Sequence, residues 1–148
     1  MLKPAKILVP TDFSKSSDNA LEQGIDIACQ YNAELHLFHV IPIDLTAAFS
    51  DYAIPFEAID SLENLEIDGA LDNMRQQLAA FPKSQQINIT MDIVKGIAYD
   101  EILKQAEREG IDLIVIASLG KSGLAKYFIG SVARNVLKKA HCPVLLTK

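Results

Sequence analysis

Apolar residues follow two alternating patterns along this chain. Short runs rich in Ile, Leu and Val predict β strands at residues 7–10, 35–41 and 143–147. Residues 113–117 are apolar throughout, which is typical of a strand that helices cover on both faces of its sheet. Residues 87–94 differ, because apolar and polar residues alternate there one by one. That period of two predicts a strand with one solvent-facing side, at an edge of the sheet.

Between these strands, apolar residues recur at intervals typical of helices. The apolar face of a first predicted helix contains Leu21, Ile25, Ala28 and Cys29. Ser14 is suited to cap the N-terminus of that helix. A long amphipathic helix runs from Ile59 to about Pro82, a third helix ends at Gly110, and a fourth covers residues 130–140.

The order of these elements predicts one α/β domain of residues 1–148. Strands that alternate with helices imply right-handed crossovers and a doubly wound parallel sheet with helices on both faces. Residues 42–56 show no clear period and predict a loop. Ligands of such folds bind beyond the carboxyl ends of the strands. The segments to search for a site are therefore residues 10–14, 40–42, 94–98 and 117–131.

Composition places the chain among ordinary globular proteins. Its 148 residues match the usual size of one domain, with 49% hydrophobic and 22% charged residues. No apolar run is long enough to cross a bilayer, and the N-terminus does not read as a signal peptide, so we expect no membrane association. Two cysteines are too few for a disulfide framework, and a cytoplasmic location follows as the default.

Charge is distributed unevenly around the net value of −5. No Lys or Arg occurs between Lys15 and Arg75, whereas no acidic residue follows Asp112. The basic C-terminal third indicates either a local positive field around an anion site or the ordinary basic end of a helix. The overall negative charge argues against nonspecific binding to nucleic acid, whose phosphates require a basic surface.

Three common motifs are excluded because residues that they require are missing. Gly120-Lys121-Ser122 resembles the end of a Walker A loop, but Val115 occupies the position of the first glycine. A nucleophile elbow would require glycine in place of Leu124, and no dinucleotide-binding glycines follow the first strand. His36, His39 and His141 show no metal-ligand spacing with the cysteines. We therefore assign no catalytic and no metal-binding residue.

One loop has the composition of a phosphate-binding site. Gly120 follows the apolar strand and allows a close backbone approach, and after nine intervening residues Gly130-Ser131 begins a helix. The free N–H groups at the start of that helix and the Ser131 hydroxyl are suited to bind phosphate oxygens. The alternative is structural, with Gly120 in a turn at the end of the strand and Ser131 as the helix cap.

Both ends of the chain resemble the universal stress protein family. The resemblance rests on residues 7–14, Ile-Leu-Val-Pro-Thr-Asp-Phe-Ser, and on the block of residues 130–146, and it covers essentially the whole chain. It implies a five-stranded parallel sheet in the order 3-2-1-4-5, which agrees with an edge position for residues 87–94. It also implies homodimers that form through the last strand, around residues 144–146.

One branch of that family binds ATP through the motif Gly-x-x-Gly, nine residues, and Gly-Ser or Gly-Thr. Gly120, Gly130 and Ser131 match this motif, whereas Ala117 replaces its first glycine and Leu119 replaces a common histidine. If the family backbone needs positive φ at Ala117, the methyl group costs about 1 kcal/mol or more. If that glycine only admits the nucleotide closely, the methyl group weakens binding without abolishing it.

The resemblance also implies roles outside the phosphate loop. Asp12 matches the acid that contacts ribose, and Val40 matches the position whose backbone meets adenine. Asp12 has an alternative role as the cap of the next helix. The ligand implied is ATP or AMP, with Mg²⁺ as a candidate companion ion. The implied nucleotide-binding residues are Pro10, Thr11, Asp12, Val40, Ala117, Gly120, Lys121, Gly123, Gly130, Ser131 and Val132.

These observations favour a stress-response protein that binds ATP or AMP and acts through conformation or through protein partners. Lys121 and Lys126 are candidate charge partners for phosphate. The alternative is a nucleotide-free dimeric interaction protein in which the same loops are structural. A nucleotide hydrolase is the third reading, but no general base or metal cluster supports more than weak ATP hydrolysis.

Overall fold

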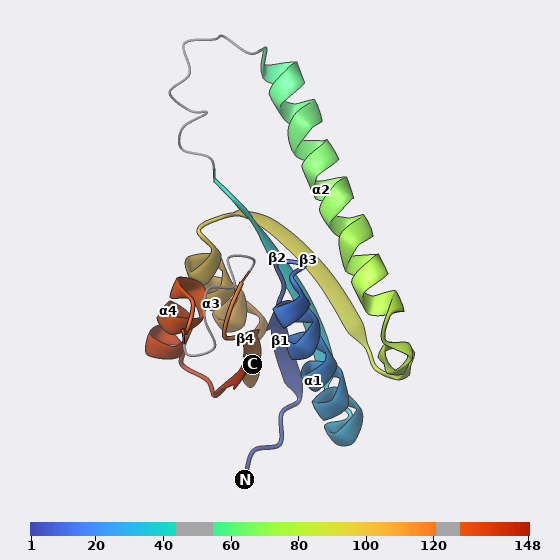
Figure 1. The fold of residues 1–148 in the computed structure, drawn as a ribbon, viewed down its shortest axis with the longest axis vertical. Helices are drawn as coiled ribbons and strands as arrows, with labels where there is room; N and C mark the ends of the chain where they lie inside the picture. The colour runs from blue at the N-terminus through green and yellow to red at the C-terminus, as the bar shows by residue number, and fades with distance from the viewer. Residues whose placement is uncertain (44–54, 121–127) are drawn as a thin grey trace.

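A computed structural model describes residues 1–43, 55–120 and 128–148 of the chain. Within these ranges, strands and helices alternate as the hydrophobic pattern predicts (Figure 1). The strands are β1 (Lys6–Pro10), β2 (Glu34–Pro42), β3 (Ile89–Gly96), β4 (Leu113–Ala117) and β5 (Val144–Thr147). The helices are α1 (Lys15–Tyr31), α2 (Phe56–Ala79), the short 3-10 helix η2 (Pro82–Gln86), α3 (Ala98–Glu109) and α4 (Ser131–Lys139).

The described strands form one parallel sheet in the order β3-β2-β1-β4-β5, which confirms the predicted topology. β1 lies at the centre, where Ile7 pairs with Leu35 of β2 on one side and with Leu113 of β4 on the other. The chain first adds β2 and β3 on one side of β1, and then crosses over to add β4 and β5. The strand order therefore reverses beside β1, and ligands of parallel sheets bind at such a reversal.

Alternate residues of the central strands face two separate cores. Ile7 and Val9 of β1 point towards α1 and α2, whereas Leu8 points towards α3 and α4. In β2, Leu37 and Phe38 divide between the two faces in the same way. Helices therefore cover both faces of the sheet, as predicted, and this explains why the central strands are apolar without interruption.

Two predicted helix ends are confirmed by their local geometry. Ser14 caps α1, because its hydroxyl oxygen accepts the Ser17 N–H at 3.1 Å. α3 ends at Gly110, where φ is 63° and the Ile111 N–H donates back to the Ala106 carbonyl at 2.9 Å. A left-handed residue at this position favours glycine, because a Cβ atom would crowd the backbone.

β3 lies at the edge of the sheet, as predicted, but its polar side is not open to solvent. Met91 packs against the core under α1 and α2. On the other side, Asp92 is half-buried and accepts a hydrogen bond of 3.2 Å from Nε2 of Gln105 on α3. The expectation of a solvent-facing side was wrong because α3 extends over it. β3 also begins at Ile89, two residues later than predicted, after η2, which the periodicity did not reveal.

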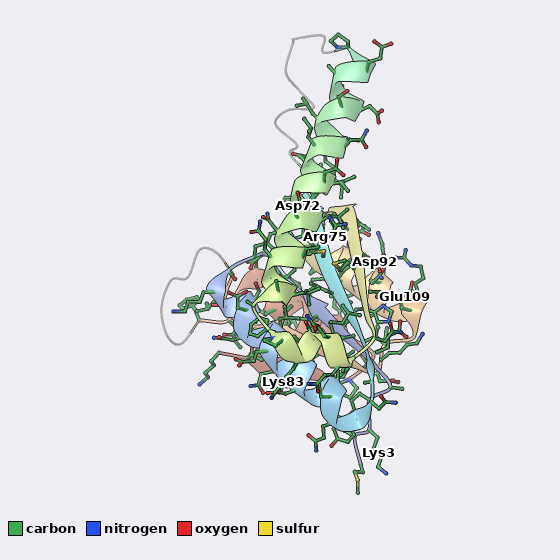
Figure 2. All side chains as sticks on the ribbon, turned by 90° about the vertical axis from the view of Figure 1, so that its right-hand side faces the viewer. Lys3, Asp72, Arg75, Lys83, Asp92 and Glu109 are labelled. Atoms are coloured by element: carbon green, nitrogen blue, oxygen red, sulfur yellow. The ribbon has the colours of Figure 1, made fainter. Side chains whose placement is uncertain are left out.

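α2 extends beyond the sheet at its N-terminal end (Figures 1 and 2). Its second half is anchored by Ala70, Met74 and Gln77, which are buried, whereas the side chains of residues 57–69 are all exposed. β2 continues to Pro42 and α2 begins at Phe56, and residues 44–54 of the predicted loop lie outside the described residues. Among the helices of the described ranges, none is long and apolar enough to cross a membrane.

α1 contacts the sheet closely at Gly24. A Cβ atom at this position would lie 2.6 Å from Cγ2 of Val9, which is fully buried in β1. Valine is stiff at χ1, so Val9 cannot turn away without disturbing the core. Gly69, in the exposed half of α2, has open space where a Cβ atom would lie. The same substitution at both glycines therefore separates two effects on stability: both positions report helix propensity, and only Gly24 also reports packing against the sheet.

We expect Gly24→Val to lower the free energy of unfolding by about 1–3 kcal/mol, because it overpacks the contact with Val9. Gly69→Val should change it by less than about 0.5 kcal/mol, since valine and glycine differ little in helix propensity and nothing obstructs the new side chain. Urea denaturation of both variants tests this difference. Equal stabilities of the two variants would contradict the close contact at Gly24.

Candidate functional site

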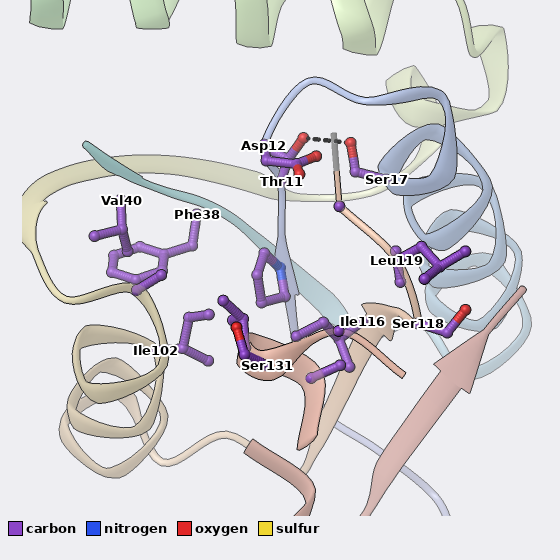
Figure 3. A pocket seen from close by; sticks show the side chains of 17 residues that line it. Thr11, Asp12, Ser17, Phe38, Val40, Ile102, Ile116, Ser118, Leu119 and Ser131 are labelled. Atoms are coloured by element: carbon purple, nitrogen blue, oxygen red, sulfur yellow. Dashed lines mark hydrogen bonds between the residues drawn. The ribbon is translucent and has the colours of Figure 1, made fainter. Parts of the chain in front are cut away.

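The carboxyl ends of β1 and β4 border a pocket of about 190 Å³ (Figure 3). Elements far apart in the sequence form its walls, namely β1, β2, β4 and the first turns of α1, α3 and α4. Lys121 and Gly123 lie outside the described residues. All the other predicted site residues line this pocket: Pro10, Thr11, Asp12, Val40, Ala117, Gly120, Gly130, Ser131 and Val132.

One end of the pocket is apolar. Figure 3 shows Phe38 and Val40 of β2 close to Ile102 of α3. Phe38 is 1% exposed and Ile102 is 2% exposed, so both are fixed by the core beneath the pocket. This end can take up a flat, weakly polar group such as a nucleobase.

Sequence reasoning missed Phe38 and Ile102 as pocket residues, although signals for both were present. Phe38 precedes Val40 by two residues on the same strand, so the period of two places both side chains on one face. Ile102 belongs to the apolar face of α3, and that face must pack beside β2 once the sheet order is known. The segments predicted to form the site lie at the ends of strands, whereas the middle of β2 and the first turns of α3 also form the walls of the pocket.

Asp12 occupies a sharp turn between β1 and α1. Phe13 has φ of 63°, which is uncommon for a residue with a side chain. Its N–H donates to Thr11 Oγ1 at 3.1 Å, and its ring centroid lies 4.5 Å from that of His39. Asp12 Oδ1 accepts the Ser14 N–H at 3.0 Å. Ser14 is the helix cap, so Asp12 closes the turn before the helix and does not cap it.

Asp12 also approaches the loop that follows β4. A Cβ atom on Gly120 would lie 2.8 Å from Asp12 Oδ2, so glycine leaves the space that this carboxylate oxygen needs. Gly120 was expected to allow a close approach to a ligand, and the structure adds a second reason for glycine here. The two segments meet at the mouth of the pocket, where a hydroxyl-bearing ligand would find the carboxylate.

Thr11 belongs to a buried hydrogen-bond network that joins β1 to two helices. Its hydroxyl lies 2.9 Å from Gln77 Oε1 of α2 and 3.0 Å from Ser17 Oγ of α1. Gln77 Nε2 donates to Asp18 Oδ1 at 2.7 Å and reaches Ser17 Oγ at 3.3 Å. The Thr11 hydroxyl is thus engaged within the protein, and Thr11 borders the pocket mainly as a support for the Asp12 turn.

The N-terminus of α4 faces the pocket. Gly130 is the cap residue and Ser131 is the first helical residue, so the alternative of Ser131 as the cap is wrong. The Gly130 N–H donates to the Ser118 carbonyl at 2.7 Å and is therefore not one of the free donors that we expected. The next three N–H groups, of Ser131, Val132 and Ala133, have no acceptor within the helix. These groups and the positive end of the helix dipole suit an anion.

Ala117 is the last residue of β4 and lines the pocket. Among the described residues other than glycine, only Phe13 and Asn32 have positive φ, so Ala117 keeps an ordinary strand conformation. Its methyl group therefore causes no backbone strain. Ala117 lines the pocket and also packs against the core under α1 and α2, so the remaining effect of this departure from the family motif is steric.

The basic residues of α4 divide between its two ends. Lys138 and Lys139 are in its last turn, where cations oppose the negative end of the dipole. Lys139 Nζ also lies 4.7 Å from the centroid of the Tyr99 ring. Arg134, in the first turn, donates from Nη2 to the Ile129 carbonyl at 3.2 Å. For Lys138 and Lys139, the structure supports the ordinary helix end rather than a field at the pocket.

Histidines and cysteines of the described chain do not assemble into a metal site. The described residues contain no cluster of three His, Cys, Asp or Glu side chains with suitable geometry. His36 is buried, with Nδ1 3.0 Å from Thr90 Oγ1, and His39 Nδ1 lies 2.7 Å from the Thr11 carbonyl oxygen. Burial raises the pKa of the Cys142 thiol, which disfavours its reactive thiolate. Cys29, on the apolar face of α1, is half-buried and packs against the core.

Comparison with known proteins supplies an independent result. Residues 4–148 match the family model described as the Universal stress protein family. Universal stress protein MJ0531 of Methanocaldococcus jannaschii is 33% identical over 143 residues, covering 97% of this chain and 81% of the relative. The solved structure of MJ0577 has a TM-score of 0.83 at 33% identity, covering 99% of this chain and 97% of that chain.

Two further solved structures contain nucleotides. A universal stress protein in complex with cAMP has a TM-score of 0.67, covering 99% of this chain and 98% of that chain. The universal stress protein from Archaeoglobus fulgidus in complex with dAMP has a TM-score of 0.61, and the match covers 99% of this chain and 100% of that chain. Both are 21% identical to this chain, so these two likenesses show a shared fold.

The Thr11–Gln77 hydrogen bond gives a test of the network that supports the Asp12 turn. Thr11→Val should lower the free energy of unfolding by about 1–3 kcal/mol, because the buried Gln77 carbonyl oxygen loses its donor. Gln77→Leu should cost less in the Thr11→Val background than in the parent. A double-mutant cycle by urea denaturation measures this coupling, and a coupling of zero would contradict the network.

Proposed function

The chain belongs to the universal stress protein family, and from this premise we propose that it binds ATP or AMP in the pocket at the carboxyl ends of β1 and β4. The observation that carries the proposal is the convergence of three chemically different surfaces on one pocket. An apolar end, a carboxylate and a helix N-terminus match the base, sugar and phosphates of a nucleotide.

Each part of the nucleotide has a candidate partner among the described residues. Val40, with Phe38 and Ile102, would take the base, and Pro10, Thr11 and Asp12 would border the ribose. Gly120 and the start of α4, from Gly130 to Val132, would hold the phosphates through backbone N–H groups. Lys121 and Gly123 remain part of the proposed phosphate loop. The family relatives bound to cAMP and dAMP are consistent with an adenine ligand.

The fit has one weak point, at Ala117. Ala117 stands in the pocket wall where the family's ATP motif has glycine, but its backbone is unstrained. We therefore expect weakened rather than abolished binding. When Mg²⁺ accompanies ATP it would supply charge compensation at the phosphates, and no described residue is assigned to it.

We further propose that the protein acts in a stress response through conformation or protein partners rather than by catalysis. We assign no catalytic residue. Because the described residues contain no group of His, Cys, Asp or Glu side chains that could hold a metal ion, we expect at most weak hydrolysis of ATP. A cytoplasmic location remains our expectation. If the pocket takes no nucleotide, the same fold would serve as an interaction protein.

β5 supports a second proposal, that the protein is a homodimer. β5 lies at the edge of the sheet, and no other strand of the described ranges pairs with its outer side. Leu145 in the middle of β5 is 38% exposed. Apolar edge strands of this kind associate readily with a second copy through an isologous contact.

Isothermal titration with ATP and with AMP tests the nucleotide proposal. Asp12→Ala should weaken binding by about tenfold or more, because a charged hydrogen bond to the sugar contributes about 1.5–3 kcal/mol. Ala117→Gly should tighten binding several-fold if the methyl group limits access. Gly120→Ala should weaken binding, because its Cβ atom displaces the Asp12 carboxylate.

Gly69→Ala is the matched control for these variants, since it adds a methyl group to a glycine far from the pocket. Its affinity should equal that of the parent. Absence of ATP and AMP binding by both the parent and Ala117→Gly would refute the nucleotide proposal and leave the interaction protein.

Light scattering at tens of micromolar protein tests the dimer. The parent should have twice the mass of one chain, and Leu145→Asp should be monomeric because it places a charge at the centre of the contact. Leu2→Asp changes a more exposed leucine near the N-terminus, 49% exposed against 38% for Leu145, and should remain dimeric. A monomeric parent would refute this proposal.

A further inference from the structure

The exposed first half of α2, residues 57–69, forms an arm that projects beyond the sheet (Figures 1 and 2). Every side chain of the arm is exposed, yet several are large and apolar. Leu62 is 56% exposed and Leu65 is 67% exposed. Isolated surface leucines are common, but neighbouring ones on a projecting helix indicate a contact surface.

Leu62 and Leu65 lie in a regular row with two small residues, whereas Ile59 and Ile67, 41% and 39% exposed, lie on other sides of the helix. Ala58, Leu62, Leu65 and Gly69 follow one another at intervals of four, three and four residues. This spacing places them on one side of the helix, as in the seam of two packed helices. The small residues at both ends would allow a second helix to approach the two central leucines closely.

This row does not point towards the protein's own core. The second half of α2 contacts the core through Ala70, Met74 and Gln77, which are also separated by four and three residues. At about 100° per residue, the helix turns the row of Leu62 and Leu65 roughly a quarter of a turn or more away from these buried positions. The sheet that anchors α2 therefore cannot cover the row.

The charge of the arm indicates which kind of protein surface could pack on the row. The arm contains five acidic residues and no Lys or Arg: Glu57, Asp60, Glu63, Glu66 and Asp68. Lys95 of β3 lies 3.3 Å from Glu63 and 3.9 Å from Glu66, and within the described residues the ion pairs of the arm are those with Lys95. Two arms packed together would bring these acids close, which opposes a second copy of the chain.

We propose that the arm is a docking site for a basic amphipathic helix of another protein. The apolar side of that helix packs on Leu62 and Leu65, and its Lys and Arg side chains lie beside the acids of the arm. The site explains two features that nucleotide binding leaves unused, the exposed leucines and the long acidic stretch without Lys or Arg. The proposal stands on the arm alone and does not depend on a ligand in the pocket.

Fluorescence anisotropy with the full chain and two labelled synthetic peptides tests the proposal. Both peptides are amphipathic helices of about three heptads with leucine at the seam positions, flanked by lysine in one and by glutamate in the other. The lysine peptide should bind, with an affinity that falls as salt rises from 50 to about 300 mM, because salt screens exposed charges. The glutamate peptide should not bind.

Variants of the arm identify where the lysine peptide binds. Leu62→Gln combined with Leu65→Gln should weaken binding by about tenfold or more, since it removes most of the apolar contact. Glu57→Gln combined with Asp68→Asn, two acids that flank the row at about 100° per residue, should weaken it less and reduce its dependence on salt. Leu2→Gln is the control, because Leu2 is 49% exposed at the opposite end of the molecule (Figure 1), and it should bind as the parent does.

Three results would overturn the proposal. The first is no binding of the lysine peptide by the parent. The second is equal binding by the double leucine variant, which would place the peptide elsewhere. The third is a self-association that Leu62→Gln with Leu65→Gln abolishes and Leu145→Asp does not, which would make a second copy the occupant of the arm.

Discussion

The parallel pairing of β1 with both β2 and β4 is the constraint on which the rest of the structure depends. Because all strands run the same way, each connection must cross a face of the sheet, and helices come to cover both faces. Because the chain adds β2 on one side of β1 and β4 on the other, the strand order reverses beside β1, and the pocket lies at that reversal. The apolar composition of the central strands and the position of the pocket thus have one cause.

Within the pocket, protein contacts compete with the groups that a ligand would need. The Gly130 N–H donates to the Ser118 carbonyl, and the Thr11 hydroxyl is hydrogen-bonded to Ser17 and Gln77. Among the described residues, the backbone of the next helical residues, Asp12 and the apolar wall beside Val40 border the space for a ligand.

Sequence reasoning anticipated the elements whose causes are local or periodic. The Ser14 cap, the Gly110 helix end and the central strands each depend on residues close together in the chain. The topology and the candidate site came from the family resemblance, and the structure brings the described site residues to one pocket. What could not be anticipated depends on distant contacts, such as α3 covering Asp92 or Asp12 requiring the space at Gly120. No pattern within one segment contains such information.

α2 joins two very different environments in one continuous helix. Its second half shares buried contacts with the sheet and reaches Thr11 through Gln77, whereas its first half is held by its own backbone hydrogen bonds and by Lys95. Amide protons of such a helix exchange with solvent by opening from the unsupported end, at a free-energy cost well below that of global unfolding. The boundary near Ala70 therefore divides the helix into a segment that opens locally and a segment whose amides exchange only when the whole domain unfolds.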